Sequence, residues 1–290
     1  MIDGLLLHDI TRGQLKAMAA NPPHAILLVG PAGSGKKTLS MALAAEIADV
    51  PYRKISSHPS LIEITRPADK TEIPIESIRG LIKALSLRTT EKTRVVLIKE
   101  AASLSEEAQN SLLKLIEEPP ARTVFILSVP ALSDILPTVA SRAQKLNILP
   151  VSHSQALEYF GKNYDDAQVT SAWMLGRAGA GSIAAILEKS GDHQLKIGVD
   201  SAKKFLNMTR YERLVFLDGI ASGREDLQAF LDALDRVLAA LAKSDIKKGA
   251  GSRTKKILAA RRHINLSMES LARNVSPRLV VVDLALNLSV

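Results

Sequence analysis

Apolar residues follow two different patterns along the first half of the chain, and each pattern predicts a different element. Short continuous apolar runs predict strands that are buried on both faces, as in a parallel sheet. Between them lie longer stretches with apolar residues every three or four positions, which predicts helices. The predicted strands are "AILLV" at 25–29, "LIEIT" at 61–65, "RVVLI" at 94–98, "TVFILSV" at 123–129 and "QKLNIL" at 144–149. Strands separated by helices indicate an α/β domain with a parallel sheet covered on both sides.

One predicted helix has clear signals at both ends. The stretch "SEEAQNSLLKLIEE" opens with Ser105 as an N-cap, carries acidic residues in its first turn, and stops before Pro119 and Pro120. The two acids before the prolines, Glu117 and Glu118, therefore fit a helix end better than a pair of catalytic carboxylates.

Strand patterns end near Pro150, and only helical patterns follow. Glycine-rich breaks at 179–181 and 190–192 interrupt these helices. The sequence thus predicts three parts: an α/β domain at 1–149, a small helical module at 150–194 and a helical C-terminal domain at 195–290.

The composition describes an ordinary globular chain with an aliphatic core. Hydrophobic residues make up 46% of the 290 residues and charged residues 23%, whereas aromatic residues make up only 3%. There are no cysteines, which excludes disulfides and cysteine-bound zinc and fits a reducing compartment. The N-terminus lacks the pattern of a secretory signal, and no apolar run is long enough to span a membrane. We therefore expect a cytoplasmic protein without a membrane partner.

The charge is strongly positive and unevenly placed. The net charge is +8 and the isoelectric point is about 9.6, which favours an anionic partner such as nucleic acid. Residues 243–263 contain eight Lys/Arg against one Asp. This stretch could attract phosphates, or it could be a solvated loop and helix face. It contains no aromatic residue, so recognition of single strands by base stacking is not indicated.

A glycine-rich loop follows the first predicted strand and opens a predicted helix. Gly30, Gly35 and Lys36 satisfy the spacing G-x-x-x-x-G-K. In this context backbone N–H groups and the helix N-terminus can cradle phosphates, and the lysine can reach the β- and γ-phosphates. The alternative is a glycine-rich turn with no ligand. The predicted nucleotide-contacting residues are Gly30, Pro31, Ala32, Gly33, Ser34, Gly35, Lys36, Lys37 and Thr38.

The usual magnesium ligands of such a loop are missing. The position after Lys36 normally carries a hydroxyl that ligates Mg²⁺, and here it is Lys37. A later strand normally ends in an acid near the ion, and here "RVVLIKEA" places Lys99 there, followed by Glu100. Because Mg²⁺ seeks oxygen ligands, two lysines argue against normal metal loading, and we predict no metal site. Thr38 and Glu100 remain as alternative ligands.

With these residues placed, the chain resembles the delta-prime subunits of bacterial DNA polymerase III clamp loaders, within the AAA+ family. The most specific stretches are "RVVLIKEAASLSEEAQNSLLKLIEEPPARTVFILSV" and "LPTVASRAQKL". The resemblance extends to "HPSLIEI" and to "NVSPRLVVVDLAL" near the C-terminus. It implies a P-loop AAA+ sheet domain, a helical lid module and an all-helical collar domain that mediates oligomerisation.

The resemblance also implies a ring-like pentamer with nucleotide sites between neighbouring subunits. Family members use a Ser-Arg-Cys motif to insert an arginine into the next subunit's ATP site. Here Ser141, Arg142 and Ala143 retain the arginine and lack the cysteine. Such a guanidinium stabilises charge on the γ-phosphate in the transition state. The alternative is that Arg142 only pairs with a carboxylate of its own chain.

Three departures from the family pattern concern the chain's own nucleotide site. Residues 38–58 hold no cysteine, so the zinc module found in many members is absent or reduced, and His24 and His58 fit ordinary polar residues. "GAGSIAAILE" at 179–188 offers no arginine to sense the γ-phosphate. Ser128 matches the position of a polar sensor on the fourth strand.

These losses predict a stator, a stationary subunit that serves its neighbours. The implied role is to help load the sliding clamp on primed DNA, together with ATPase subunits and a clamp-opening subunit. By resemblance the chain is part of the DNA polymerase III holoenzyme, with no polymerase activity of its own and little or no ATPase activity. Whether ATP or ADP occupies the loop stays open. The alternatives are an autonomous AAA+ ATPase acting on DNA and an interaction scaffold with an empty loop.

Overall fold

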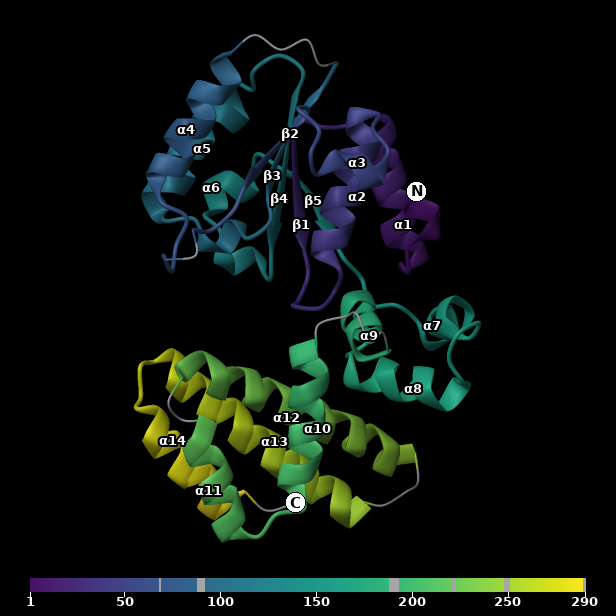
Figure 1. Ribbon diagram of the computed structural model, residues 1–290, viewed down its shortest axis with the longest axis vertical. Coiled ribbons are helices and arrows are strands. Elements are labelled where there is room, and N and C mark those ends of the chain that lie inside the picture. The colour runs from purple at the N-terminus through teal and green to yellow at the C-terminus, as the bar shows by residue number, and fades with distance from the viewer. Residues whose placement is uncertain (68, 88–91, 188–192, 221–222, 248–250, 289–290) are drawn as a thin grey trace. The chain divides into compact units, whose positions relative to one another are not determined.

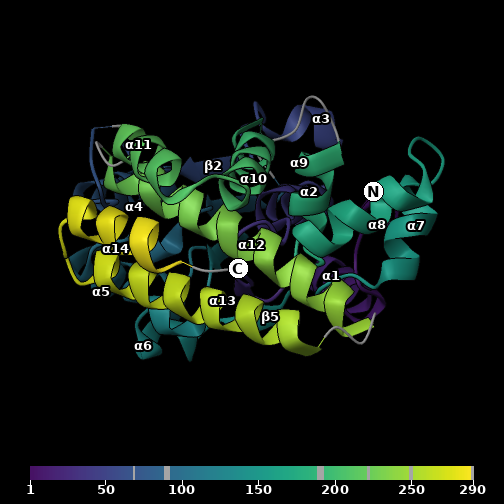
Figure 2. The ribbon, with the colours of Figure 1, turned by 90° about the horizontal axis from the view of Figure 1, so that it is seen from below.

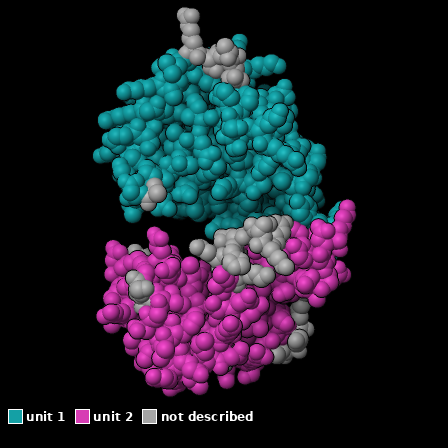
Figure 3. Space-filling view, viewed as in Figure 1, with its two compact units in different colours: residues 1–159, 179–181 teal, residues 160–178, 182–290 magenta. Residues whose placement is uncertain are grey.

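The computed structural model describes residues 1–67, 69–87, 92–187, 193–220, 223–247 and 251–288. The chain forms two compact units, coloured separately in Figure 3: unit 1 comprises Met1–Tyr159 and Gly179–Gly181, and unit 2 comprises Phe160–Ala178 and Ser182–Val290. The predicted module at 150–194 thus contributes residues to both units. The three-part division stays a prediction, and the expected break at 190–192 lies outside the described residues.

Unit 1 is an α/β sheet domain, as the sequence predicts (Figure 1). The expected strands begin at the predicted positions, and two of them, β2 and β5, end earlier than expected. The elements are η1 Ile2–Gly4, α1 Asp9–Ala20, β1 Ala25–Val29, α2 Lys36–Ala48, α3 Tyr52–Ile55, β2 Leu61–Ile64, α4 Ile75–Ser86, β3 Arg94–Ile98, η2 Ala101–Ser103, α5 Glu106–Glu117, β4 Thr123–Val129, η3 Leu132–Asp134, α6 Pro137–Ala140, β5 Gln144–Asn147 and α7 His153–Phe160.

All strand pairs in the sheet are parallel, in the order β2-β3-β4-β1-β5. Successive side chains of a strand point to opposite faces, so each inner strand serves two cores. Leu27 of β1 packs with α4, α5 and α6, whereas Leu28 packs with α1, α2 and α3. Burial on both faces explains why these strands read as continuous apolar runs.

The predicted capping of α5 is confirmed. The Ser105 hydroxyl accepts a hydrogen bond from the Ala108 N–H at 3.2 Å, and Glu106 and Glu107 occupy the first turn. The helix ends at Glu117, ahead of Pro119 and Pro120, whose rings cannot continue a helix.

Unit 2 is helical throughout its described residues, as expected beyond Pro150. Helices α12 and α13 pack side by side (Figure 2), and α11 packs on α14. The helices are α8 Asp166–Leu175, α9 Ala180–Leu187, α10 His193–Leu206, α11 Arg210–Ile220, α12 Arg224–Lys247, α13 Gly251–Ala272 and α14 Pro277–Asn287, with the first residues of α9 assigned to unit 1. No described helix of either unit is both long and apolar enough to cross a bilayer.

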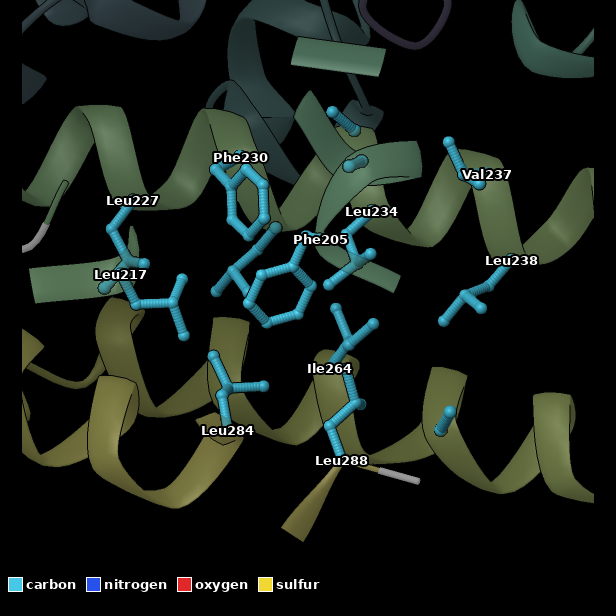
Figure 4. Packing of buried hydrophobic residues seen from close by; sticks show 14 of the residues in the cluster. Phe205, Leu217, Leu227, Phe230, Leu234, Val237, Leu238, Ile264, Leu284 and Leu288 are labelled. Carbon is cyan, nitrogen blue, oxygen red and sulfur yellow. The ribbon is translucent and has the colours of Figure 1, made fainter. Parts of the chain in front are cut away.

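The core of unit 2 has an aromatic centre (Figure 4). Phe205, Phe216 and Phe230 pack together, and the Phe205 and Phe230 rings meet nearly edge to face with centroids 5.3 Å apart. Aliphatic side chains of α12, α13 and α14 surround them, including Leu234 and Leu284. The buried clusters are mainly aliphatic, as the composition predicted, and three of the five phenylalanines gather at this one place.

Candidate functional site

The glycine-rich loop lies between β1 and α2, in the strand–loop–helix context that the sequence predicts. Gly33 and Gly35 adopt φ angles of +77° and +91°, a region that favours glycine. Gly35 is the residue before the first turn of α2, so the backbone curls sharply into the helix N-terminus. Lys37 and Thr38 follow on that first turn and are exposed to solvent.

The lysine of the loop is bound to the loop itself. The Lys36 ammonium donates hydrogen bonds to the carbonyl oxygens of Gly30 and of Pro31, the second at 2.9 Å. Burial lowers the pKa of this ammonium below its ordinary value. A bound phosphate would therefore have to compete with two backbone carbonyls for the donors of Lys36.

A three-residue segment from much later in the chain contacts the loop. Gly179–Gly181 belongs to unit 1, and the backbone of Gly181 lies directly on the loop. A Cβ at Gly181 would stand 3.0 Å from the Gly33 carbonyl oxygen and 3.2 Å from the Gly35 nitrogen, so only glycine fits without a shift. The loop backbone at Gly35 thus lies against Gly181, whereas Pro31 and Ala32 are exposed to solvent.

The two lysines at the expected magnesium-ligand positions have different environments. Lys37 is exposed on α2, whereas the Lys99 ammonium lies 2.5 Å from a carboxylate oxygen of Glu63 on β2. Glu100 in turn pairs with Arg66, whose Nε lies 3.4 Å from its carboxylate oxygen. Glu63 neutralises Lys99, and Arg66 engages the acid that could have served as a metal ligand or water-orienting base.

Two further candidate residues have structural partners. The buried Ser128 hydroxyl, expected at a sensor position, donates a hydrogen bond to the carbonyl oxygen of Lys99. This bond links β4 to the residue that follows β3. His58 accepts a hydrogen bond from the Ser60 N–H at 3.2 Å, within one local turn. Among the described residues, no group of histidine and acidic side chains is placed to hold a metal ion.

Arg142 lies between α6 and β5, with a side chain that is 39% exposed. Its Nε atom is 2.6 Å from a carboxylate oxygen of Glu117, and its Nη1 donates to the Thr138 carbonyl oxygen at 2.9 Å. The pairing that the sequence raised as an alternative is therefore present. It uses only part of the guanidinium and leaves open a role outside the chain.

Sequence reasoning missed the partners of these candidates. Glu117 could have been noticed, because an acid at a helix C-terminus is unfavourable for the helix dipole. Gly181 could have been noticed only as part of a glycine-rich break. Glu63 and Arg66 gave no signal, because the pairing depends on β2 lying beside β3.

Residues 10–152 match the family described as DNA polymerase III, delta subunit. The match spans 143 of the 290 residues, and over this region the chain is similar to that family. The match contains the loop, Lys99, Ser128 and Arg142, and it confirms the delta-prime-like resemblance expected from the sequence.

Individual relatives agree with this match. DNA polymerase III subunit delta' of Haemophilus influenzae is 29% identical over 150 residues, which cover 47% of this chain and 46% of that protein. The replication factor C small subunit of Aeropyrum pernix is 26% identical over 234 residues, covering 78% of this chain and 66% of that protein. The matched regions thus span less than two thirds of either relative.

A solved structure extends the similarity in fold to nearly the whole chain. A DNA polymerase III gamma subunit-related protein from Thermotoga maritima aligns with a TM-score of 0.60 over 95% of this chain and 97% of that one. The aligned residues are 16% identical, so this likeness concerns the fold alone. The predicted class, a P-loop sheet domain followed by helices, is confirmed.

Proposed function

We propose that this chain is a clamp-loader subunit in DNA replication that supplies Arg142 to an ATP site on a neighbouring subunit. The observation that carries the proposal is a contrast within unit 1. Within the described residues, Lys36 of the chain's own loop is bound by loop carbonyls, and the nearby acids Glu63 and Glu100 are paired. Arg142, in contrast, lies at the surface. A subunit with these features serves a neighbour's hydrolysis better than its own.

The chain's own nucleotide turnover is low in this proposal. Lys36 is engaged by loop carbonyls, Lys99 is paired with Glu63, and the Gly35 backbone contacts Gly181. ATP or ADP binding would require Lys36 to exchange its carbonyl partners for phosphate oxygens. The loop then keeps the local shape of unit 1 and acts little as a hydrolytic centre.

The proposed partners are other clamp-loader subunits, namely ATPase subunits and a clamp-opening subunit. Unit 2 offers a suitable surface for another subunit's helical unit, because apolar side chains are exposed on the neighbouring helices α11 and α14. The most exposed of these are Tyr211, Val215, Leu279, Val282 and Leu286. Through the complex the chain would act on the sliding clamp and primed DNA, in the cytoplasm.

The basic stretch at 243–263 contributes less to this proposal than its charge suggests. Arg253 pairs with Asp245, Arg261 pairs with Asp235, and the Lys243 ammonium lies 5.5 Å from the ring centre of Trp173. Residues 248–250 lie outside the described residues. The cations that do have described partners stabilise unit 2, and direct DNA binding here is not part of the proposal.

The test is ATP hydrolysis by the reassembled complex, stimulated by clamp and primed DNA, with the natural chain or Arg142→Ala. We expect a fall of at least tenfold, because removing an arginine that acts in trans removes transition-state stabilisation. Arg79→Ala, which removes an exposed arginine of α4, is the matched control and should leave the rate unchanged. An unchanged rate in Arg142→Ala, with assembly intact by gel filtration, would refute the trans role.

A second measurement separates this proposal from an autonomous ATPase. Steady ATP turnover by the isolated chain that disappears in Lys36→Ala would support the autonomous enzyme. No turnover above the background of the Lys36→Ala chain is the expected result.

A further inference from the structure

We propose that Glu117 is a positioning residue that fixes the Arg142 guanidinium for use by a neighbouring subunit. This inference rests on the proposed function of Arg142 and adds a second residue to it. The observation behind it is the three-way contact between the end of α5, the α6 turn and Arg142.

The contacts hold one edge of the guanidinium and leave the other edge accessible. Nε lies 2.6 Å from the Glu117 carboxylate, and Nη1 donates to the Thr138 carbonyl oxygen at 2.9 Å and to the Ser141 hydroxyl at 3.5 Å. Within the described part of the chain, Nη2 has no hydrogen-bond partner. Arginine presents five N–H donors in a rigid fork, so fixing Nε and Nη1 sets the direction of Nη2.

The backbone around Glu117 is well suited to hold a carboxylate in place. Glu117 is the last residue of α5, and the following Glu118 donates its N–H to the Lys114 carbonyl oxygen before Pro119 ends the helix. On the other side, the Ser141 hydroxyl donates to the same Thr138 carbonyl that binds Arg142, at 3.0 Å. The groups that accept hydrogen bonds from the guanidinium therefore belong to the last turn of α5 and to the single turn of α6 with the Ser141 that follows it.

Glu117 lies at a position where its carboxylate destabilises the helix that carries it. A carboxylate at a helix C-terminus is unfavourable, because the last carbonyl groups already carry partial negative charge. A residue that breaks a local rule in this way points to a role beyond the helix. Pairing with Arg142 offsets the cost and orders the arginine at the same time.

The pairing with Glu117 does not prevent Arg142 from binding a phosphate. Both side chains are partly exposed, 39% for Arg142 and 45% for Glu117, so solvent screens their attraction. A phosphate, with more charge than one carboxylate and three acceptor oxygens, would compete easily for the guanidinium. Orientation survives this screening, because the hydrogen bonds restrict the rotamers of a long flexible side chain.

The experiment measures stimulated ATP hydrolysis by the reassembled complex with Glu117→Ala, Glu117→Gln, Arg142→Ala and the double variant. We expect Glu117→Ala to lower kcat about three- to tenfold with little change in KM for ATP, because a misplaced group costs mainly transition-state stabilisation. Glu117→Gln should keep more than half of kcat, since its amide oxygen still accepts from Nε. The double variant should be no slower than Arg142→Ala, as expected for two residues that act as a unit.

Glu118→Ala is the matched control, because Glu118 is the adjacent exposed acid. It should leave kcat unchanged, and every variant should assemble normally by gel filtration. A fall in Arg142→Ala together with an unchanged or higher kcat in Glu117→Ala would overturn positioning and leave the trans role standing. An equal loss in Glu117→Gln and Glu117→Ala would also overturn it, in favour of charge alone. No effect of Arg142→Ala would instead refute the proposed function.

Discussion

Replacing Asp235 with alanine should destabilise unit 2. Asp235 lies on α12 with a side chain that is only 6% exposed. Its carboxylate accepts from Arg261 Nε of α13 at 2.8 Å and from Arg177 Nη2, just after α8, at 2.6 Å. One buried carboxylate thus joins three segments of the unit.

The expected loss follows from these contacts. Hydrogen bonds to charged groups contribute about 1.5–3 kcal/mol each, and removing one partner of a buried ion pair costs about 3–5 kcal/mol. Arg177 and Arg261 are 41% and 31% exposed, so water takes up part of their lost interaction. We therefore expect a decrease of about 2–3 kcal/mol in the free energy of unfolding. With a urea slope of about 2 kcal/mol per molar, the midpoint falls by ~1–1.5 M.

The chain provides its own probe for this measurement. Trp173 is the single tryptophan and lies on α8 in unit 2, so its fluorescence during urea unfolding follows that unit. Asp200→Ala is the control, because Asp200 is 57% exposed and forms a weak surface pair, with 3.9 Å between its carboxylate oxygen and the Lys203 ammonium. We expect the control to stay within about 0.5 kcal/mol of the natural chain. A loss below 1 kcal/mol for Asp235→Ala would show that the ionic contacts add nothing beyond surface pairs.

Four further outcomes test other parts of the structure. Phe205→Ala should lower the stability of unit 2 by about 3–5 kcal/mol in the same assay, because it empties the aromatic centre; a loss under 1 kcal/mol would contradict that packing. Ser105→Ala should cost about 1 kcal/mol in thermal or urea unfolding of unit 1, whereas no change would mean that the N-cap bond is absent in solution. Gly181→Ala should speed amide hydrogen exchange of Gly35, because the added methyl group would push the two backbones apart, even though alanine favours helices more than glycine does. Slower exchange would disprove the close contact between Gly181 and Gly35. Any ADP that the chain binds should be held almost equally with and without Mg²⁺, since Lys37 replaces a metal ligand; a large loss of affinity with a chelator would refute this.

The sheet of unit 1 could be predicted because its signals are local. β1 and β3 are buried on both faces, so each reads as an unbroken apolar run ended by a loop. The start of α5 was equally readable, because Ser105 and the following acids act within one turn. The phosphate loop was found for the same reason, since its glycines and Lys36 are consecutive in sequence.

Contacts between distant segments could not be predicted in this way. Lys99 meets Glu63 only because β2 lies beside β3, and nothing in either local stretch encodes that order. Arg142 was found from its motif, but its partner Glu117 is 25 positions earlier and was read as a helix end. The aromatic centre around Phe205 shows the same limit, because composition gives the number of rings and not their grouping.

The assignment of Gly179–Gly181 to unit 1 has a practical consequence for dissecting the molecule. The chain leaves unit 1 after Tyr159, returns for three residues, and leaves again at Ser182. A single proteolytic cut after Tyr159 would release a sheet fragment whose loop has lost its contact with Gly181. Nucleotide affinity measured on such a fragment would be that of a loop without its Gly181 contact. The nucleotide affinity of the native loop can be measured only on the intact polypeptide.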